Sequence, residues 1–214
     1  PPRDGGEYII SGDVASGIDG DDTELGECYS VWDVLDTSSW EQVAQWRGRV
    51  APDTFGEIGV MLGTFYNEGL LCPEVNNHGL TTCTIIQNLG YRRLFIRSDT
   101  KGGTDMGFFT APGETGTRAR LINALRAALR DFTIKINSPA TFSEMRSFVR
   151  LDTGKLGPQS GTFSDTVFSL GIGVLLLEMR TAVPEAKTAG GRSRLTMANR
   201  GRQAVTYPYK GGYS

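Results

Sequence analysis

Acidic residues crowd the start of this chain, where its first apolar segment ends. The stretch IISGDVASGIDGDDTELGE, residues 9–27, reaches Asp13 directly after an apolar run and then carries Asp19, Asp21 and Asp22 among glycines. Neighbouring carboxylates repel one another and are costly to bury unless a cation lies between them. The stretch is therefore either an idle, solvated loop or one part of a metal site.

Two further acids stand at comparable positions later in the chain. Glu74 follows a short apolar run in LLCPEVNNHG, and Asp165 lies in the expected first turn of the last helix, in QSGTFSDTVFSLGIGV. Three carboxylates, in a chain with a single histidine and no CxxC pair, suit Mg²⁺ or Mn²⁺ better than zinc. Two such ions about 4 Å apart activate water and stabilise the leaving oxygen in phosphodiester cleavage.

Each of these acids also has an ordinary structural interpretation. Glu74 can pair with an arginine such as Arg92. Asp13 can simply cap its loop, and Asp165 suits the positive end of a helix dipole. Taken singly, each acid favours the structural interpretation. The combination of two strand ends and one helix start is what indicates a site.

Alternating segments rich in aromatic and β-branched residues predict the first strands. Residues 7–14, 28–36 and 42–50 are expected to form an antiparallel meander, with a hairpin turn at residues 37–40. The first of these strands carries the first candidate acid at its end.

Helical periodicity separates the later strands. Helices are predicted at residues 53–68 and 80–89, and they are followed by strands at residues 70–75 and 91–97. Because the later strands alternate with helices, we expect a mixed sheet with helices on its faces. The first and fourth strands can then lie side by side, which brings both strand-end acids to the edge where such sheets usually carry a site.

The second half of the chain predicts mainly helices. Residues 98–117 are rich in glycine and threonine and are expected to form a long loop or flap, and residues 150–162 a turn-rich loop. The remaining expected elements are a short strand at residues 132–136 and helices at residues 118–131, 138–149 and 163–179.

The composition is that of an ordinary globular protein. The chain has 214 residues, of which 39% are hydrophobic and 21% charged, so it can bury one large core. No apolar run reaches about 18 residues, and the N-terminal PPRDGGEY lacks the apolar core of a signal peptide, so neither a membrane span nor secretion is expected. The three cysteines, Cys28, Cys72 and Cys83, are expected to be reduced thiols in the core.

The net charge of −2 hides an uneven distribution. Residues 1–27 carry eight acids against Arg3, whereas residues 181–214 carry six basic residues against Glu185. The basic segment lacks helical periodicity and is expected to be a flexible or accessory tail, which leaves residues 1–180 as the main domain. It is either a solvated terminus or a segment that binds a polyanion.

Four segments of the chain resemble, in order, the C-terminal nuclease domain of the large terminase subunit of tailed bacteriophages. They are SGDVASGIDGDD, APDTFGEIGVMLGTFYNEGLLCPEVNNHG, KINSPATFSEMRSFV and SGTFSDTVFSLGIGV, and PEVNNHG is the most specific. Together they span nearly the whole chain to about residue 180. The resemblance implies an α/β, ribonuclease H-like fold, a mixed sheet of three antiparallel strands followed by βαβ units and flanked by helices.

The same resemblance implies a metal-dependent endonuclease that cuts concatemeric viral DNA during genome packaging, in the host cytoplasm. Matched residue by residue, it makes Asp13, Glu74 and Asp165 the catalytic ligands of two Mg²⁺ or Mn²⁺ ions. Asp22 matches a further acid that acts as a helper ligand, and Asp21 can replace it in register. The implied partners are double-stranded DNA, an N-terminal ATPase domain in the full-length chain, the portal and the small terminase subunit, with no membrane.

The chain departs from the family pattern in two places. The last family motif often reads His-Asp-Asp, whereas this chain has Phe163-Ser164-Asp165, so one carboxylate and one imidazole are missing. We therefore expect either a weaker second metal site or compensation by the aspartates of the first loop. The chain also lacks the GxxxxGK[ST] loop of an ATPase motor, so it is an excised nuclease domain or a stand-alone relative, and its start at proline favours excision.

Basic residues away from the acidic edge are the candidates for DNA contacts. The best single candidate is Lys101 in the glycine-rich flap, and the others are arginines of one helix and the tail, namely Arg118, Arg120, Arg126, Arg130, Arg192 and Arg194. At least half of the helix arginines are expected to be only solvated. Contacts of this kind read the charge of the DNA backbone, so little sequence preference is expected.

Polar residues also follow Glu74 in the loop after the fourth strand. His78 is expected to form hydrogen bonds within this loop rather than to act as a general base. Asn76 and Asn77 are expected to be turn residues that hold the loop.

Three other functions stay open. A resolvase or transposase of the same fold is usually more basic, so the isoelectric point near 5.5 counts against it. A non-catalytic module that docks a motor onto a portal is kept open by Ser164. An actin-like phosphate-binding fold is suggested by GDVASG, but the second phosphate loop of that fold is missing.

Overall fold

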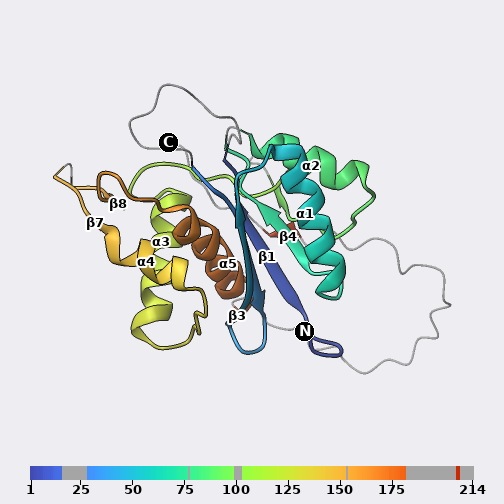
Figure 1. The fold of residues 1–214 in the computed structure, drawn as a ribbon, viewed down its shortest axis with the longest axis horizontal. Helices are drawn as coiled ribbons and strands as arrows, with labels where there is room; N and C mark the ends of the chain where they lie inside the picture. Colours follow the sequence, from blue (N-terminus) through green and yellow to red (C-terminus); the bar gives the residue numbers. More distant parts are fainter. Residues whose placement is uncertain (16–27, 77, 99–102, 153, 182–205, 208–214) are drawn as a thin grey trace.

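The fold is described from a computed structural model that covers residues 1–15, 28–76, 78–98, 103–152 and 154–181, with the backbone of residues 206–207. At its centre is a four-stranded sheet in the order β3-β2-β1-β4 (Figure 1). Its strands are β1 Tyr8–Asp13, β2 Ser30–Asp36, β3 Glu41–Gly48 and β4 Leu70–Pro73.

The strand pairing confirms the two main predictions about this sheet. Strands β1, β2 and β3 form an antiparallel meander, whose turn lies between Asp36 and Glu41. Strand β4 pairs with β1 in parallel, with Ile9 opposite Leu70 and Gly12 opposite Pro73. The carboxyl ends of β1 and β4 therefore lie together at one edge of the sheet.

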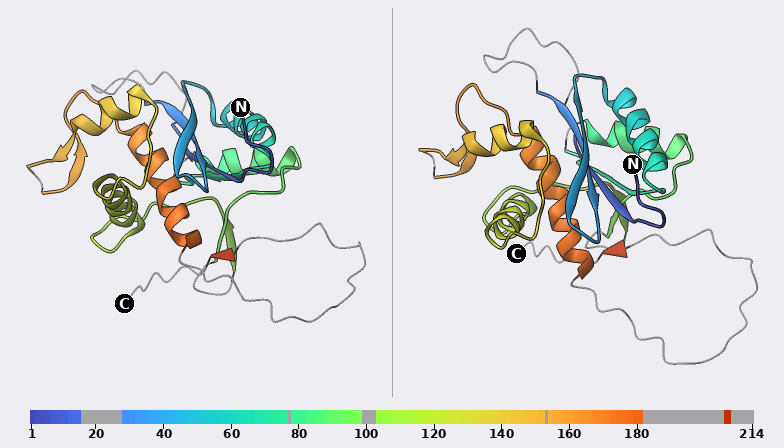
Figure 2. Two further views of the ribbon diagram at one scale, coloured as in Figure 1. Left: turned by 90° about the horizontal axis from the view of Figure 1, so that it is seen from below. Right: turned by 60° about the horizontal axis from the view of Figure 1, so that its bottom comes forward.

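Helices cover both faces of the sheet, as Figure 2 shows from two sides. Helices α1 (Pro52–Phe65) and α2 (Gly79–Asn88) lie on one face. Helix α5 (Asp165–Thr181) lies on the other and packs directly on β1 and β2. Helices α3 (Thr117–Arg130) and α4 (Pro139–Ser147) pack against α5 on its outer side.

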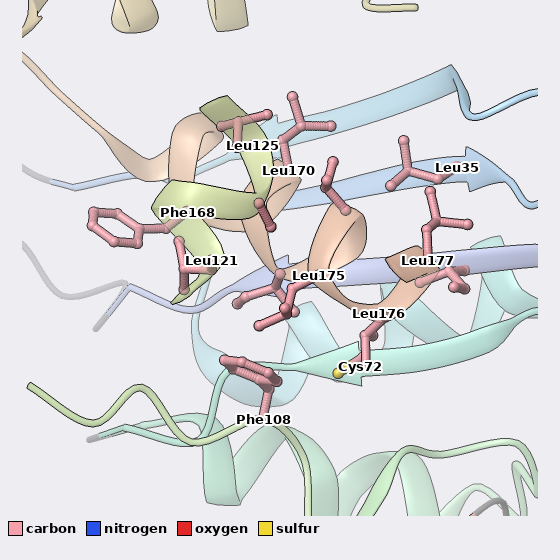
Figure 3. Close-up of a cluster of buried hydrophobic side chains, with 14 of the residues drawn as sticks. Leu35, Cys72, Phe108, Leu121, Leu125, Phe168, Leu170, Leu175, Leu176 and Leu177 are labelled. Carbon is pink, nitrogen blue, oxygen red and sulfur yellow. The ribbon is translucent and has the colours of Figure 1, made fainter. Parts of the chain in front are cut away.

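Neighbouring residues of β1 point into two separate cores. Ile9 belongs to the core beneath α5, whereas Ile10 belongs to the core beneath α1 and α2. The alternation follows from the pleat of a strand, in which successive side chains point to opposite faces. Figure 3 shows the first of these cores, where Leu121 of α3 and Leu175 of α5 lie among leucines and phenylalanines above the sheet. Because almost every residue of the first three turns of α5 is buried, this helix is the centre of that core.

The smaller strands differ from the predictions. The segment predicted as a strand at residues 91–97 is paired only in part, through a single bridge of Leu94 to Leu71 and the short strand β5 (Ile96–Ser98). Strand β5 pairs with β6 (Thr104–Met106), which lies inside the predicted flap, and with the backbone of β9 (Thr206–Tyr207).

Two predictions near α4 are wrong. Helix α4 ends at Ser147, and the next residues form strand β7 (Phe148–Arg150), which pairs with β8 (Leu156–Pro158) inside the predicted loop. The predicted strand at residues 132–136 is absent from the described structure apart from one bridge between Lys135 and Glu41. Because these segments are short, their apolar residues fit a strand or a helix end equally well.

No helix among the described residues is long and apolar enough to cross a membrane. The cysteine prediction is right for Cys72 and Cys83, which are buried and unpaired, and wrong for Cys28, which is exposed.

Candidate carboxylate site

Asp13 and Glu74 meet at the edge where β1 and β4 end. Gly12 and Pro73 are partners in the sheet, and the amide of Glu74 donates a hydrogen bond to the carbonyl of Gly12 over 2.7 Å. Burial raises the pKa of Asp13 well above its usual range, and the charge and hydrogen bonding of Glu74 and the charge of Asp165 raise it further. Asp13 is therefore a half-buried acid whose ionised form is costly in this environment.

The loop that carries Glu74 is fixed by its backbone. The amide of Val75 donates to the carbonyl of Phe108 over 2.8 Å. Asn76 exchanges two hydrogen bonds with the backbone of Thr110, at 2.8 and 3.0 Å, which confirms its predicted role in holding the loop. At Gly79, a Cβ atom would lie 1.7 Å from the carbonyl oxygen of Glu74, so only glycine allows α2 to begin this close to the acid.

Asp165 lies in the first turn of α5, as predicted, and is almost completely buried. Its Oδ2 atom accepts a hydrogen bond from the amide of Tyr29 over 2.9 Å. Burial raises the pKa of Asp165 to about 6, although the Tyr29 amide opposes that shift. Like Asp13, it is held in a place where its ionised form is costly.

The three predicted acids share one electrostatic environment, since the charges of Glu74 and Asp165 both raise the pKa of Asp13. Among the described residues, no group of three Asp, Glu, His or Cys side chains is arranged to hold a metal ion. The donor set nevertheless suits a hard divalent cation, because all three side chains offer carboxylate oxygens and two of them are destabilised as free anions.

Arg118 is the one predicted DNA contact that the described structure brings to this edge. Its guanidinium lies 4.2 Å from the ring centroid of Phe168 on α5. Burial lowers the pKa of Arg118, while Glu74 and Asp13 raise it. Among the described residues it forms no ion pair with either acid, so its charge stays available to a further anion.

The other predicted residues lie away from this site or outside the described residues. Arg120 is exposed beside Glu178 on α5. His78 is exposed at the start of α2 and its side chain does not cap that helix. The predicted residues that lie outside the described ones are Asp19, Asp21, Asp22, Asn77, Lys101, Arg192 and Arg194.

Glu144 and Arg47 stand beside the site and were missed by the sequence analysis. Glu144 on α4 accepts hydrogen bonds from the amide and hydroxyl of Thr166 and from Arg47 on β3. These partners are separated from Glu144 by 22 and 97 residues in the chain, and no local pattern marks such a pairing. The only available signal was the position of Glu144 inside KINSPATFSEMRSFV, one of the four segments that resemble the terminase nuclease domain.

A further buried acid, Asp33, lies deeper in the same face of the sheet. It sits opposite Ser11 on β1, two residues before Asp13. Its Oδ1 atom accepts hydrogen bonds from the side-chain amides of Gln42 and Gln45, at 2.6 and 2.8 Å, and no described residue donates a hydrogen bond to its Oδ2 atom. Burial raises the pKa of Asp33 to about 6.

Comparison with solved structures identifies the fold. The large terminase nuclease from thermophilic phage G20c with bound magnesium matches with a TM-score of 0.59 at 17% identity, over 81% of this chain and 82% of that chain. The same nuclease with bound cobalt matches with a TM-score of 0.59 at 16% identity, over 81% and 82%. The large terminase nuclease domain of Thermus phage P74-26 matches with a TM-score of 0.51 at 16% identity, over 80% of each chain.

No protein-family model and no curated protein matches the sequence. The structural matches confirm the predicted fold, a ribonuclease H-like mixed sheet flanked by helices, as found in phage large terminase nucleases.

Proposed function

We propose that this chain is a metal-dependent endonuclease that cleaves concatemeric viral DNA during genome packaging, with little sequence preference. The observation that carries the proposal is the meeting of Asp13 and Glu74 at the carboxyl edge of a terminase-nuclease fold, with Asp165 acting on the same site from α5. The raised pKa values of Asp13 and Asp165 add support, because acids kept for structure are normally stabilised by a nearby cation or by donors.

In this proposal Asp13, Glu74 and Asp165 hold two Mg²⁺ or Mn²⁺ ions, with Asp22 as a helper ligand. When bound, the ions supply a nucleophilic water and stabilise the charge on the leaving oxygen. The chain itself supplies the geometry. The sheet register sets the spacing of Asp13 and Glu74, and the amide of Tyr29 fixes one oxygen of Asp165.

DNA is held in this proposal through its backbone. The carboxylate edge repels phosphates, so attraction comes from cations such as Arg118 that lie beside it. Phosphate contacts carry no base information, which accounts for the low sequence preference. The proposed setting is a packaging motor, with an ATPase domain, a portal and a small terminase subunit as partners.

Two observations favour a second candidate, a non-catalytic module that docks on DNA or on a portal. Ser164 stands where the family motif has an acid, and no closed set of metal ligands is formed by the residues that the structure describes. A module of this kind keeps the fold and the basic contacts but does not cut.

A plasmid-nicking assay separates the two candidates. The wild-type chain is incubated with supercoiled plasmid and Mn²⁺, with Mg²⁺, and with chelator, and Asp13→Asn is run in parallel. Nicking that requires the metal and is lost in Asp13→Asn supports the nuclease. Plasmid binding without nicking under any metal condition supports the docking module instead.

A further inference from the structure

Asp165 is held in place by three residues that are not themselves proposed ligands, Glu144, Arg47 and Tyr29, which together form a brace. We propose that Glu144 and Arg47 are positioning residues for Asp165. This inference rests on the proposed function, in which Asp165 binds a metal ion. The brace is formed by three contacts that converge on the first turn of α5.

The first contact fixes the start of the helix. Glu144 is 6% exposed, and its Oε2 atom accepts hydrogen bonds from the amide and the hydroxyl of Thr166, at 2.8 and 2.7 Å. Thr166 directly follows Asp165 in the first turn of α5. A carboxylate is favourable at this end of a helix because it satisfies a free amide and complements the helix dipole.

The second contact fixes the carboxylate of Asp165 itself. The guanidinium of Arg47 lies 3.5 Å from the centroid of the Tyr29 ring, and the ring of Phe163 packs edge-on against Tyr29. The amide of Tyr29 donates to Oδ2 of Asp165 over 2.9 Å. Oδ1 of Asp165 accepts no hydrogen bond from the described residues, so it is the oxygen left for a cation.

The third contact joins the first two. Nη2 of Arg47 donates to Oε1 of Glu144 over 3.1 Å, so one arginine contacts both the acid that caps α5 and the ring whose residue holds Asp165. The Glu144 side chain is 7% exposed and that of Arg47 is 26% exposed, so water screens this pair little. A buried ion pair of this kind is weak support for stability but specifies one geometry.

Helix α4 is itself anchored to the strand that carries Arg47. Oε1 of Gln42 accepts hydrogen bonds from the amides of Asn137 and Ser138, both at 2.9 Å. Oε1 of Gln45 accepts one from the hydroxyl of Ser138 over 2.6 Å, and its amide donates to Thr141 over 2.9 Å. Both ends of the Glu144–Arg47 pair are therefore tied to β3, which keeps the brace in register with the sheet.

The test compares Glu144→Ala, Glu144→Gln and Arg47→Ala with Asp36→Asn as the matched control. Asp36 is also a buried carboxylate paired with an arginine, but it lies at the opposite end of β2. Glu144→Gln keeps an acceptor for Thr166 and places an amide donor beside Arg47. If Glu144→Ala does not fold, Glu144→Gln and Arg47→Ala carry the test.

Three measurements are made on each folded variant. In metal-free protein, hydrogen exchange of the Tyr29 amide is expected to be about tenfold faster in the Glu144 and Arg47→Ala variants and unchanged in Asp36→Asn. With metal, the Mn²⁺ dissociation constant from titration calorimetry is expected to rise about 10- to 100-fold, as for other groups that orient metal ligands. The kcat for nicking is expected to fall while KM for DNA stays constant, and Arg47→Lys is expected to restore part of the loss.

The outcomes separate the two proposals. If the wild-type protein neither binds Mn²⁺ nor nicks DNA, the proposed function is wrong, and the exchange rate of Tyr29 still decides whether the brace holds this site. If Tyr29 exchange and Mn²⁺ affinity in the Glu144 variants equal those of Asp36→Asn, the positioning role is overturned while the nuclease proposal stands.

Discussion

The two ends of the β1–β2 pair each carry an acid, Asp36 buried and Asp13 half-buried, and the two acids are held in opposite ways. At one end, Arg3 donates two hydrogen bonds of 2.8 Å to Asp36. Burial alone would raise the pKa of Asp36, but the donors of Ser38, Arg3 and Ser39 together outweigh it and lower the pKa. At the other end, Asp13 has Glu74 as its neighbour, and its pKa is raised well above its usual range.

An arginine near the acid can also be compared between the two ends, and these two arginines differ in the same way. Arg3 is committed to Asp36, whereas Arg118 rests on the ring of Phe168 without an ion pair among the described residues. A structural acid and a candidate ligand can therefore be told apart by their neighbours. The structural acid has its donors within the fold, whereas the candidate ligand faces other carboxylates that make its ionised form costly.

The largest expected effect is on cleavage. Asp13→Asn, Glu74→Gln and Asp165→Asn should each reduce the rate of plasmid nicking at least about 100-fold, because each metal ligand contributes several kcal/mol to charge stabilisation. Asp36→Asn should leave the rate within about twofold once folding is equal. Rates are measured with Mn²⁺ below the melting temperature of every variant. A nearly full rate in any of the three variants removes that acid from the site.

The next effect concerns Asp33, which lies between the two ends of β2 and accepts hydrogen bonds from two side-chain amides. Its pKa of about 6 exceeds the value of 3.8 for the free side chain. The folded state therefore binds this proton more tightly, and its stability falls as the pH rises from about 4 to 6. Asp33→Asn should remove that loss and stabilise the protein by about 1–3 kcal/mol at pH 8.

Urea unfolding of wild type and Asp33→Asn at pH 4 and pH 8 measures this effect. The stabilisation should nearly vanish at pH 4, where the wild-type carboxyl is protonated. An equal difference at both pH values would show that Asp33 is not held as a destabilised anion.

A smaller effect, on the stability of the metal-free protein, is expected to have opposite signs at the two ends of the β1–β2 pair. Without metal at pH 8, Asp13→Asn should stabilise the protein by about 1 kcal/mol, because it relieves repulsion within the carboxylate pair. Asp36→Asn should destabilise it by about 1–2 kcal/mol, because the donors of Ser38 and Ser39 lose a charged acceptor. Thermal unfolding with chelator present gives both signs, and a loss of stability in Asp13→Asn would mean that this acid is structural.

The smallest effect concerns Arg118 and Arg120, two of the arginines of α3, which differ in their distance from the carboxylate site. Arg118→Ala should weaken DNA binding about tenfold and lower the slope of log affinity against log salt by about 0.9 for one lost phosphate contact. Arg120→Ala removes the same charge at an exposed position beside Glu178 and should change affinity less than about threefold. Equal losses in both variants would mean that only net charge matters and that Arg118 has no special place.

The sheet and its candidate acids could be predicted because their signals are local. The alternation of apolar and polar residues predicted β1, β2 and β3. The helical patterns on both sides of residues 70–75 indicated a separate strand there, β4, which could lie beside β1. The helix predicted at residues 53–68 ends at Phe65 instead, since Asn67 and Glu68 both take the left-handed backbone conformation. Asparagine adopts this conformation more readily than most residues, so Asn67 was a weak signal for that end.

The parts that failed depend on contacts between distant segments. The strand predicted at residues 91–97 is only partly paired, because tertiary neighbours rather than alternation decide how far a strand extends. The brace of Glu144, Arg47 and Tyr29 was missed for the same reason. An acid in the middle of an amphipathic helix is usually solvated, and only its burial against α5 shows otherwise.

The hydrogen bond between Tyr29 and Asp165 joins residues that are 136 positions apart, and this has a consequence for the growing chain. During synthesis, the four strands of the sheet leave the ribosome well before α5, whose leucines fill the core on one face. The last acid arrives on the helix that closes that core. A nascent or truncated chain thus lacks the complete set of carboxylates, so the candidate site is assembled only when folding is finished.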